Sequence, residues 1–217
     1  MTRVKICCIS SIEEAQLAIK YGASALGLVS TMPSGPGVIS EELIEEIAKK
    51  IPPGIATFLL TSKQSVEEII EQQRRCKTNT VQICDNIVQG NYNQLKKALP
   101  GIKIVQVIHI TGEEALDEAI EVSKNVDALL LDSGNQKLAV KELGGTGRTH
   151  DWTISRKIVE SVKVPVFLAG GLNAENVADA VQHVKPFGVD ICSGVRTNGK
   201  LDERKVKSFF ANLNTVQ

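Results

Sequence analysis

The sequence alternates between short apolar runs rich in Val, Ile and Leu and amphipathic stretches whose apolar residues lie three or four positions apart. The runs are typical of strands that are buried on both faces of a parallel sheet, and the amphipathic stretches are typical of the helices that cover it. The predicted strands are Val4–Ile9, Ala25–Ser30, Ile55–Leu60, Thr80–Cys84, Lys103–Ile110, Ala128–Ser133, Val164–Gly170 and Gly188–Gly194.

Eight strand–helix units predict an α/β fold of the (β/α)8 TIM-barrel type, with residues 1–217 forming a single domain. No linker or change in composition interrupts the series. The alternative is an open, doubly wound sheet, which usually carries its phosphate-binding glycines after the first strand. This chain has Cys7-Cys8-Ile9-Ser10 at that point, which favours the barrel. Ser40 and Ser65, each followed by glutamates, are predicted to cap the helices that follow them.

The composition limits the class of partner. The chain has 25 basic and 25 acidic residues that are mixed along its length, so no basic face predicts nucleic-acid binding. No apolar run approaches the roughly 20 residues that span a bilayer, and the N-terminus shows no signal-peptide core. Five cysteines, none of them in a Cys-x-x-Cys pair, predict reduced thiols rather than disulfides or zinc ligands. We therefore expect a cytoplasmic protein with a small-molecule partner, no nucleic-acid or membrane partner, and no metal.

Two glycine-rich turns end the seventh and eighth predicted strands. Glycine lets backbone N–H groups come close to an anion, and barrels commonly bind phosphate with the loops after these two strands. The alternative is a pair of ordinary tight turns. A long loop after the sixth strand is expected either to enclose the phosphate from a third side or to act as a flexible hinge. The three segments are 168–172, 191–195 and 144–147, and together they favour a phosphorylated small molecule as substrate.

Cys7 ends the first predicted strand, beside the mouth of a barrel where active sites lie. Because side chains alternate along a strand, Cys8 is predicted to point away from the interior. Lys5 shares the face of Cys7, and a nearby cation favours the thiolate. In a closed barrel Asp190 on the eighth strand lies next to Lys5, and we expect it to neutralise that charge. The alternative for both cysteines is a small buried core residue.

Asp132 ends the sixth predicted strand, which is otherwise wholly apolar. The alternative here is an aspartate that caps the following loop through the backbone. Cys7 and Asp132 would approach the mouth from opposite sides. This arrangement suits acid–base chemistry across a small substrate, because a thiolate accepts a proton and a carboxylic acid donates one. His109, amid apolar residues of the fifth strand, is predicted to be a hydrogen-bonded barrel residue rather than a base.

These motifs, in their order along the chain, resemble those of the phosphoribosylanthranilate isomerase family over essentially the full length. The segments that carry the resemblance are Val4-Lys5-Ile6-Cys7, residues 21–28, Leu129-Leu130-Leu131-Asp132, Gly144-Gly145-Thr146-Gly147 with Asp151-Trp152, Ala169-Gly170-Gly171-Leu172 with Glu175-Asn176-Val177, and Val189-Asp190 with Ser193-Gly194-Val195.

The resemblance implies an isomerase of tryptophan biosynthesis that converts N-(5'-phosphoribosyl)anthranilate to the 1-deoxyribulose phosphate by an Amadori rearrangement. Asp132 would be the general acid that opens the ribose ring to a Schiff base, and Cys7 the general base that removes the C2' proton. No cofactor is implied, because the iminium itself is the electron sink. The resemblance places the substrate phosphate on Gly145, Gly147, Gly170, Gly171, Ser193 and Gly194.

The chain departs from the family pattern at the end that would hold anthranilate. The loop 33–39 has no Lys or Arg, where the family usually has an arginine for the anthranilate carboxylate. Cys84-Asp85 stands in place of His-Gly, and Cys8 in place of a glycine.

We hypothesise that Arg148 or Arg196, the latter in place of a family glutamate, supplies the missing cation. The alternatives are a diverged paralogue that acts on another phosphorylated aminosugar and a phosphosugar-binding protein without turnover. Whichever of these functions the protein has, we expect it to be a monomer or a homodimer.

Overall fold

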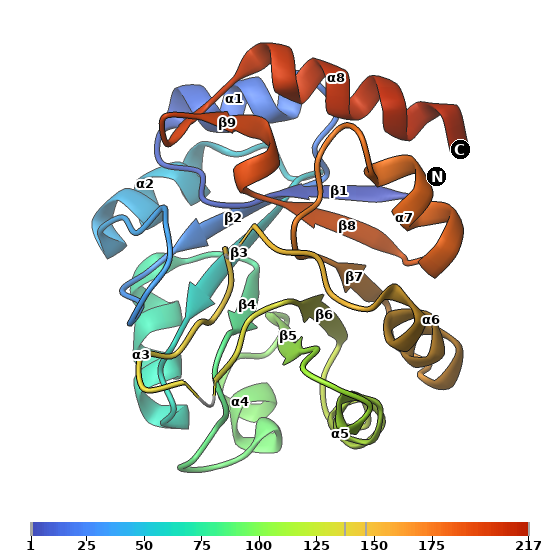
Figure 1. The fold of residues 1–217 in the computed structure, drawn as a ribbon. Coiled ribbons are helices and arrows are strands. Elements are labelled where there is room, and N and C mark those ends of the chain that lie inside the picture. Colours follow the sequence, from blue (N-terminus) through green and yellow to red (C-terminus); the bar gives the residue numbers. More distant parts are fainter. Residues whose placement is uncertain (1, 137, 146, 217) are drawn as a thin grey trace.

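Eight parallel strands form a closed barrel in the computed structural model, which describes residues 2–136, 138–145 and 147–216. Each strand pairs with the next along the chain, and the first pairs with the last, so the ring has no edge (Figure 1). The strands are β1 (Arg3–Ile6), β2 (Ala25–Val29), β3 (Ala56–Thr61), β4 (Thr80–Ile83), β5 (Lys103–His109), β6 (Ala128–Asp132), β7 (Val166–Leu168) and β8 (Gly188–Ile191). The predicted TIM-barrel fold is therefore confirmed, and the doubly wound alternative is wrong.

An outer ring of helices surrounds the barrel, as Figure 1 shows. The helices are α1 (Ile12–Lys20), α2 (Glu41–Lys50), α3 (Val66–Cys76), α4 (Tyr92–Ala98), α5 (Glu114–Ser123), α6 (Trp152–Ser161), α7 (Val177–Val184) and α8 (Glu203–Leu213). Short elements lie between β8 and α8 and after α8: η1 (Ser193–Val195), β9 (Arg196–Thr197), β10 (Lys200–Leu201) and η2 (Asn214–Val216). None of the described helices is long and apolar enough to cross a membrane.

One of the two predicted helix caps is confirmed. The Ser40 side chain accepts a hydrogen bond from the backbone N–H of Leu43, which satisfies an otherwise unpaired donor of the first turn. Ser65 precedes its helix without such a bond. There the N–H of Val66 instead donates to the carbonyl of Gln89, so a neighbouring loop satisfies the helix end.

The core has two layers. Apolar residues on the outward faces of the strands pack against the helices, and a separate cluster fills the barrel interior. Within the interior, Phe58 and Phe167 meet edge to face with centroids 5.9 Å apart, and the Lys5 ammonium lies 5.4 Å from the Phe58 ring centroid. The interior is thus a packed core below the mouth, which leaves the C-terminal ends of the strands to form a site.

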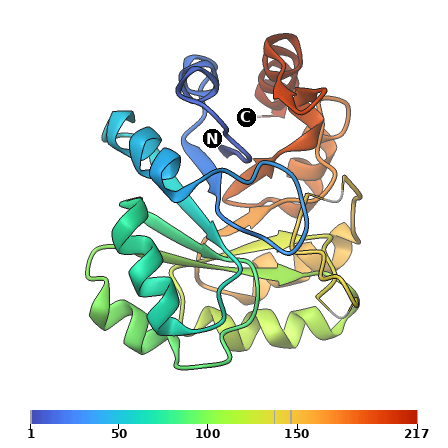
Figure 2. The ribbon, with the colours of Figure 1, turned by 90° about the vertical axis from the view of Figure 1, so that its left-hand side faces the viewer.

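Long connections gather at that mouth. The loop after β2 and the loop after β6 lie side by side in both views (Figures 1 and 2), and the Ser34 hydroxyl joins them by donating to the Lys141 carbonyl at 2.6 Å. All eight strands contribute to one ring, so we propose that the chain is a single domain.

Candidate active site

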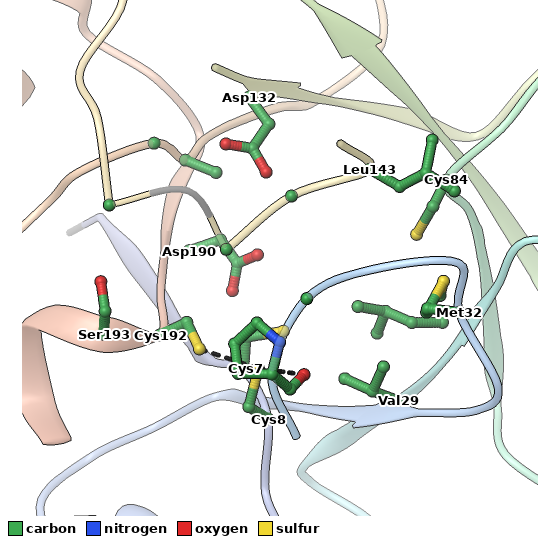
Figure 3. A pocket seen from close by; sticks show the side chains of 18 of the residues that line it. Cys7, Cys8, Val29, Met32, Cys84, Asp132, Leu143, Asp190, Cys192 and Ser193 are labelled. Atoms are coloured by element: carbon green, nitrogen blue, oxygen red, sulfur yellow. Dashed lines mark hydrogen bonds between the residues drawn. The ribbon is translucent and has the colours of Figure 1, made fainter. Parts of the chain in front are cut away.

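A pocket opens at the C-terminal ends of the strands, and the loops after β1, β2, β6, β7 and β8 all contribute to it (Figure 3). Cys7 and Asp132 both line it, from opposite sides, as the sequence predicts. The lining residues are Cys7, Cys8, Val29, Met32, Ser34, Gly35, Pro36, Leu60, Gln82, Cys84, Asp132, Leu143, Gly144, Gly145, Gly147, Ala169, Gly170, Gly171, Leu172, Asp190, Cys192 and Ser193.

Cys7 follows directly after β1, and its backbone N–H continues the barrel ladder by donating to the carbonyl of Ile191 at 2.8 Å. Its side chain lies on the inner face together with Lys5. Gly27 on the neighbouring strand leaves room for both, because a Cβ there would lie 2.9 Å from the Cys7 sulfur and 3.0 Å from the Lys5 ammonium. A thiol in this position can reach a substrate in the pocket from the barrel side.

The predicted outward orientation of Cys8 is wrong. The strand ends at Ile6, so the alternation of side chains no longer applies two residues later. Cys8 takes a left-handed backbone conformation with φ of 61°, and its side chain lines the pocket beside that of Cys7. Its thiol donates to the Pro36 carbonyl at 3.5 Å and lies 2.8 Å from the Cys192 sulfur.

Asp132 is the last residue of β6, and its carboxyl group is almost wholly buried. Burial raises its pKa above the ordinary range, and a hydrogen bond from the Ser133 N–H and the neighbouring His109 oppose that shift. A carboxyl group that keeps its proton more readily than usual suits a general acid. The Ser133 bond shows that Asp132 caps its own loop, as the alternative interpretation predicted, while its role as a general acid stays a prediction.

Lys5 and Asp190 form the ion pair that a closed barrel predicts. The two residues are paired in register across β1 and β8, and the ammonium lies 2.8 Å from the carboxylate with both side chains buried. Burial favours the neutral form of Lys5, but the Asp190 charge overrides it and raises the lysine pKa. Burial likewise raises the pKa of Asp190, against the pull of Lys5. The opposite charges of the two residues therefore offset each other at the base of the pocket, which Asp190 lines.

Three glycine-rich loops converge at one end of the pocket. Gly171 has a φ of 61°, and a Cβ there would lie 2.6 Å from the Arg148 carbonyl carbon, so only glycine lets the loops after β6 and β7 touch. A Cβ on Gly147 would lie 3.7 Å from the Ser193 hydroxyl, which brings the loop after β8 to the same place. Gly145, Gly147, Gly170, Gly171 and Ser193 all line the pocket, while Thr146 lies outside the described residues.

Gly194, the sixth residue assigned to the phosphate, does not line the pocket. A Cβ on it would lie only 2.1 Å from the Leu172 carbonyl oxygen, so it packs the β8 loop closely against the β7 loop, and its contact with a phosphate stays a prediction. Packing of the two turns supports the positions of Gly171 and Ser193.

The structure brings neither predicted arginine into the pocket. Arg196 is buried beneath it, where its guanidinium bonds to Glu14 and to the backbone carbonyls of Cys7 and Cys8. These bonds leave it no access to a substrate, so the hypothesis that it binds a substrate carboxylate is wrong. Arg148 is exposed and forms an ion pair with Glu142. The long sequence separation of the Arg196 contacts explains why the sequence pattern did not reveal them.

His109 behaves as predicted. Its Nε2 is 3.0 Å from the Cys84 carbonyl, and the residue lies in register with Asp132 on the adjoining strand. His109 thus connects the end of β5 to the segment after β4, and it is not among the described residues that line the pocket.

Two buried acceptors to which the sequence analysis assigned no role in binding belong to residues that line the pocket. Gln82 Oε1 and Asp190 Oδ1 are both buried without a hydrogen-bond partner among the described residues, and both residues line the pocket. Unpaired buried acceptors are unfavourable unless a ligand satisfies them. Both therefore suit the hydroxyl groups of a polyol or sugar.

The end of the pocket opposite the glycines is apolar. Val29, Met32, Leu60 and Leu143 line it, and none of the described lining residues is a lysine or an arginine. Lys141 does not line the pocket, but its ammonium lies 2.6 Å from the buried carboxylate of Asp85, the residue that follows the lining residue Cys84. The absence of a basic residue in the loop 33–39 and the replacement of His-Gly by Cys84-Asp85 pointed to this end beforehand, but the Lys141–Asp85 contact, which spans 56 positions, did not follow from the sequence. The described residues contain no cluster of side chains suited to a metal ion.

Comparison with known proteins agrees with this geometry. Residues 4–212 match the family model for N-(5'phosphoribosyl)anthranilate (PRA) isomerase. The chain is 38% identical to N-(5'-phosphoribosyl)anthranilate isomerase 2 of Methanosarcina mazei over 95% of its own length and 92% of the relative's.

Solved structures share the fold. A phosphoribosylanthranilate isomerase in complex with reduced 1-(o-carboxyphenylamino)-1-deoxyribulose 5-phosphate superposes with a TM-score of 0.80 at 27% identity, covering 99% of this chain and 100% of that one. Monomers generated from the dimeric phosphoribosylanthranilate isomerase of Thermotoga maritima superpose with a TM-score of 0.80 at 26% identity, with the same coverage of both chains.

Proposed function

Because the chain belongs to the N-(5'-phosphoribosyl)anthranilate isomerase family, we propose that its pocket rearranges this aminoaldose phosphate to the corresponding 1-deoxyribulose phosphate. The enzyme is thus an aldose–ketose isomerase of tryptophan biosynthesis. The observation that carries the proposal is that Cys7 and Asp132 line one pocket from opposite sides, next to a glycine-lined end whose chemistry suits a phosphate.

The chemistry divides between the two residues. Asp132, whose burial favours the protonated form, donates its proton to the furanose ring oxygen, and the C1'–O bond breaks to give an iminium ion. The Cys7 thiolate removes the C2' proton, the electron pair of that C–H bond forms the C1'=C2' double bond, and the π pair of the C1'=N bond moves to nitrogen to give an enolamine. Tautomerisation of the enolamine then yields the C2' ketone and a C1' methylene group. The positively charged nitrogen of the iminium accepts the electrons released at C2'. Asp132 and Cys7 therefore need to supply only proton transfer and positioning.

The remaining lining residues match the other parts of this substrate. Gln82 and Asp190 offer unpaired acceptors for ribose hydroxyls, and Asp190 keeps its other oxygen on Lys5. The backbone of Gly145, Gly147, Gly170 and Gly171, with Ser193, would surround the phosphate. The apolar end would enclose the anthranilate ring.

We assign the anthranilate carboxylate to Lys141. Its backbone carbonyl accepts a hydrogen bond from Ser34 in the β2 loop, and its ammonium is held by Asp85, which follows the lining residue Cys84. An ammonium group has three donors, and one of them goes to Asp85. No other described residue bonds to this ammonium, so the other two donors can serve a carboxylate, and this interaction takes the place of the arginine that the loop 33–39 lacks.

Replacing Lys141 with Met is expected to raise KM about tenfold with little change in kcat. Hydrogen bonds to charged groups contribute about 1.5–3 kcal/mol, and a contact made equally in the ground and transition states affects binding alone. Steady-state kinetics would measure this beside Lys157→Met, a matched control whose ammonium pairs with Glu113 on the helical surface. Equal KM values for the two variants would contradict the assignment.

Turnover by the purified protein tests the function directly. The substrate is generated in situ from anthranilate and phosphoribosyl pyrophosphate, and its conversion is followed by the loss of fluorescence. We expect saturable turnover at neutral pH. If turnover is absent but a phosphosugar still raises the melting temperature, the protein is a paralogue with another substrate or a binding protein without turnover.

We further propose that the enzyme works in the cytoplasm, because all five cysteines are free thiols and the pocket holds four of them. The state of assembly, monomer or homodimer, stays a prediction that light scattering would test.

A further inference from the structure

We propose that Cys8 and Cys192 are a redox-active dithiol site, which small disulfides oxidise reversibly to an internal disulfide at the rim of the pocket. The two sulfur atoms are 2.8 Å apart, although the residues are 184 positions apart in the sequence. Cys8 follows β1 and Cys192 follows β8, which are paired neighbours in the barrel. A disulfide has an S–S distance of about 2.05 Å, so less than about 1 Å of movement would join them.

The two thiols differ in exposure and in pKa. These differences suit Cys192 to attack an external disulfide and Cys8 to resolve the mixed disulfide that results. Cys192 is partly exposed and lines the pocket, so a small reagent can reach it. The hydrogen bond that it shares with Cys8 lowers its pKa, and the nearby Arg196 guanidinium acts in the same direction. The same hydrogen bond raises the pKa of Cys8, which is buried. Cys192 is therefore the nucleophile, because the thiolate and not the thiol attacks.

The reaction is an exchange that balances without a further oxidant. The Cys192 thiolate attacks one sulfur of the small disulfide, forms a mixed disulfide and releases one thiolate. Cys8 loses its proton and attacks the Cys192 sulfur, which breaks the mixed disulfide and releases the second thiolate. One external disulfide is reduced to two thiols, and one protein disulfide is formed. An external dithiol reverses both steps.

The other cysteines lack this combination. Cys76 is buried on α3, away from the pocket, and burial raises its pKa to about 12. Cys84 lines the pocket but is buried, and burial raises its pKa as well. Figure 3 shows Cys84 on the far side of the pocket from the Cys7, Cys8 and Cys192 sulfurs. Cys7 is the one competitor of Cys8 for the Cys192 sulfur.

The crosslink would affect the site that lies between its ends. Cys8 is bonded to the proposed base Cys7 along the chain, and Cys192 is bonded to Ser193 at the proposed phosphate end. Formation of the Cys8–Cys192 disulfide would therefore shift both Cys7 and Ser193. A shift of about 1 Å at a catalytic group can lower a rate about 100-fold, so we expect turnover to fall about tenfold or more on oxidation. This effect on turnover rests on the proposed function, whereas formation of the disulfide does not.

The test oxidises the reduced full-length protein with 2-hydroxyethyl disulfide, alkylates the remaining thiols and digests with trypsin. Mass spectrometry is expected to find peptide 6–20, which contains Cys7 and Cys8, linked to peptide 164–196, which contains Cys192. The link should persist in Cys7→Ser and disappear in Cys8→Ser and Cys192→Ser, with Cys84→Ser as the matched pocket control that retains it. No link in the wild-type protein, or a link that survives in Cys8→Ser, would overturn the proposal.

Turnover is then compared between the oxidised and the reduced state of each protein, so that each variant is its own reference. We expect the wild-type loss to follow the fraction of linked peptide and to be reversed by dithiothreitol, and we expect oxidation to leave Cys8→Ser within about twofold of its reduced rate. A complete link with unchanged turnover would overturn the coupling to activity. A link in a protein that shows no turnover even when reduced would instead contradict the proposed function and leave the dithiol site supported.

Discussion

Turnover of N-(5'-phosphoribosyl)anthranilate is expected to fall about 10²–10⁴-fold when Asp132 is replaced with Asn or Cys7 with Ala, because general acid–base catalysis contributes about that much. Asparagine keeps the shape of the side chain and its place at the end of β6 but has no proton to donate. Alanine removes the thiol that lies on the inner face beside Lys5. The variants and the wild-type protein would be compared by kcat from the fluorescence assay.

The pH profile separates the two roles. Asp132 must be protonated to act as an acid, and burial raises its pKa, so wild-type activity should decline as the pH rises past that raised value. The residual activity of Asp132→Asn should lack this decline, while that of Cys7→Ala should keep it. Cys76→Ala is the control, since this thiol is buried on α3 and does not line the pocket. Full activity in either pocket variant, with the control unaffected, would remove that residue from the mechanism.

The second large effect is on stability. Replacing Lys5 with Met is expected to lower the free energy of unfolding at neutral pH by about 3–5 kcal/mol, because it leaves the buried Asp190 carboxylate without its cation. Lys63→Met is the control. Its ion pair with Glu68 is exposed, so a change within about 1 kcal/mol is expected. Urea unfolding followed by circular dichroism would measure both.

The deficit of Lys5→Met should depend on pH. Burial already raises the pKa of Asp190, and loss of Lys5 removes the main opposing influence. A group whose pKa is raised in the folded state contributes its full stabilisation below its unfolded pKa, about 3.9, and loses it as the pH rises through the folded value. The deficit relative to the wild type should therefore be smaller near pH 4.5 than near pH 7.5.

A double variant, Lys5→Met with Asp190→Leu, should recover most of the lost stability, since replacement of a whole buried ion pair by apolar groups is often nearly neutral. A deficit that is independent of pH, or a double variant that is less stable than Lys5→Met, would show that packing rather than charge explains the loss.

The sequence predicted the features that depend on local pattern. The eight strands begin within about two residues of their predicted starts, because the alternation of apolar runs and amphipathic stretches follows from which faces a barrel buries. Predicted strand ends were less accurate: β1 ends at Ile6 rather than at Ile9, and β8 ends at Ile191 rather than at Gly194. Cys7, Asp132 and the paired glycines could be assigned to the mouth because the ends of parallel strands meet at one face. Closure of the ring also paired Lys5 with Asp190.

Only the tertiary structure decided four other features. These are the orientation of Cys8, the hydrogen-bonded guanidinium of Arg196, the Lys141–Asp85 pair and the contact of Cys8 with Cys192. Each involves a residue beyond the end of a barrel strand, where the period of two of that strand no longer fixes the direction of a side chain. Each joins segments far apart in the chain, such as the 182 positions between Glu14 and Arg196. A periodic pattern reports which face of an element is buried, whereas contacts between loops depend on how the closed barrel brings their ends together.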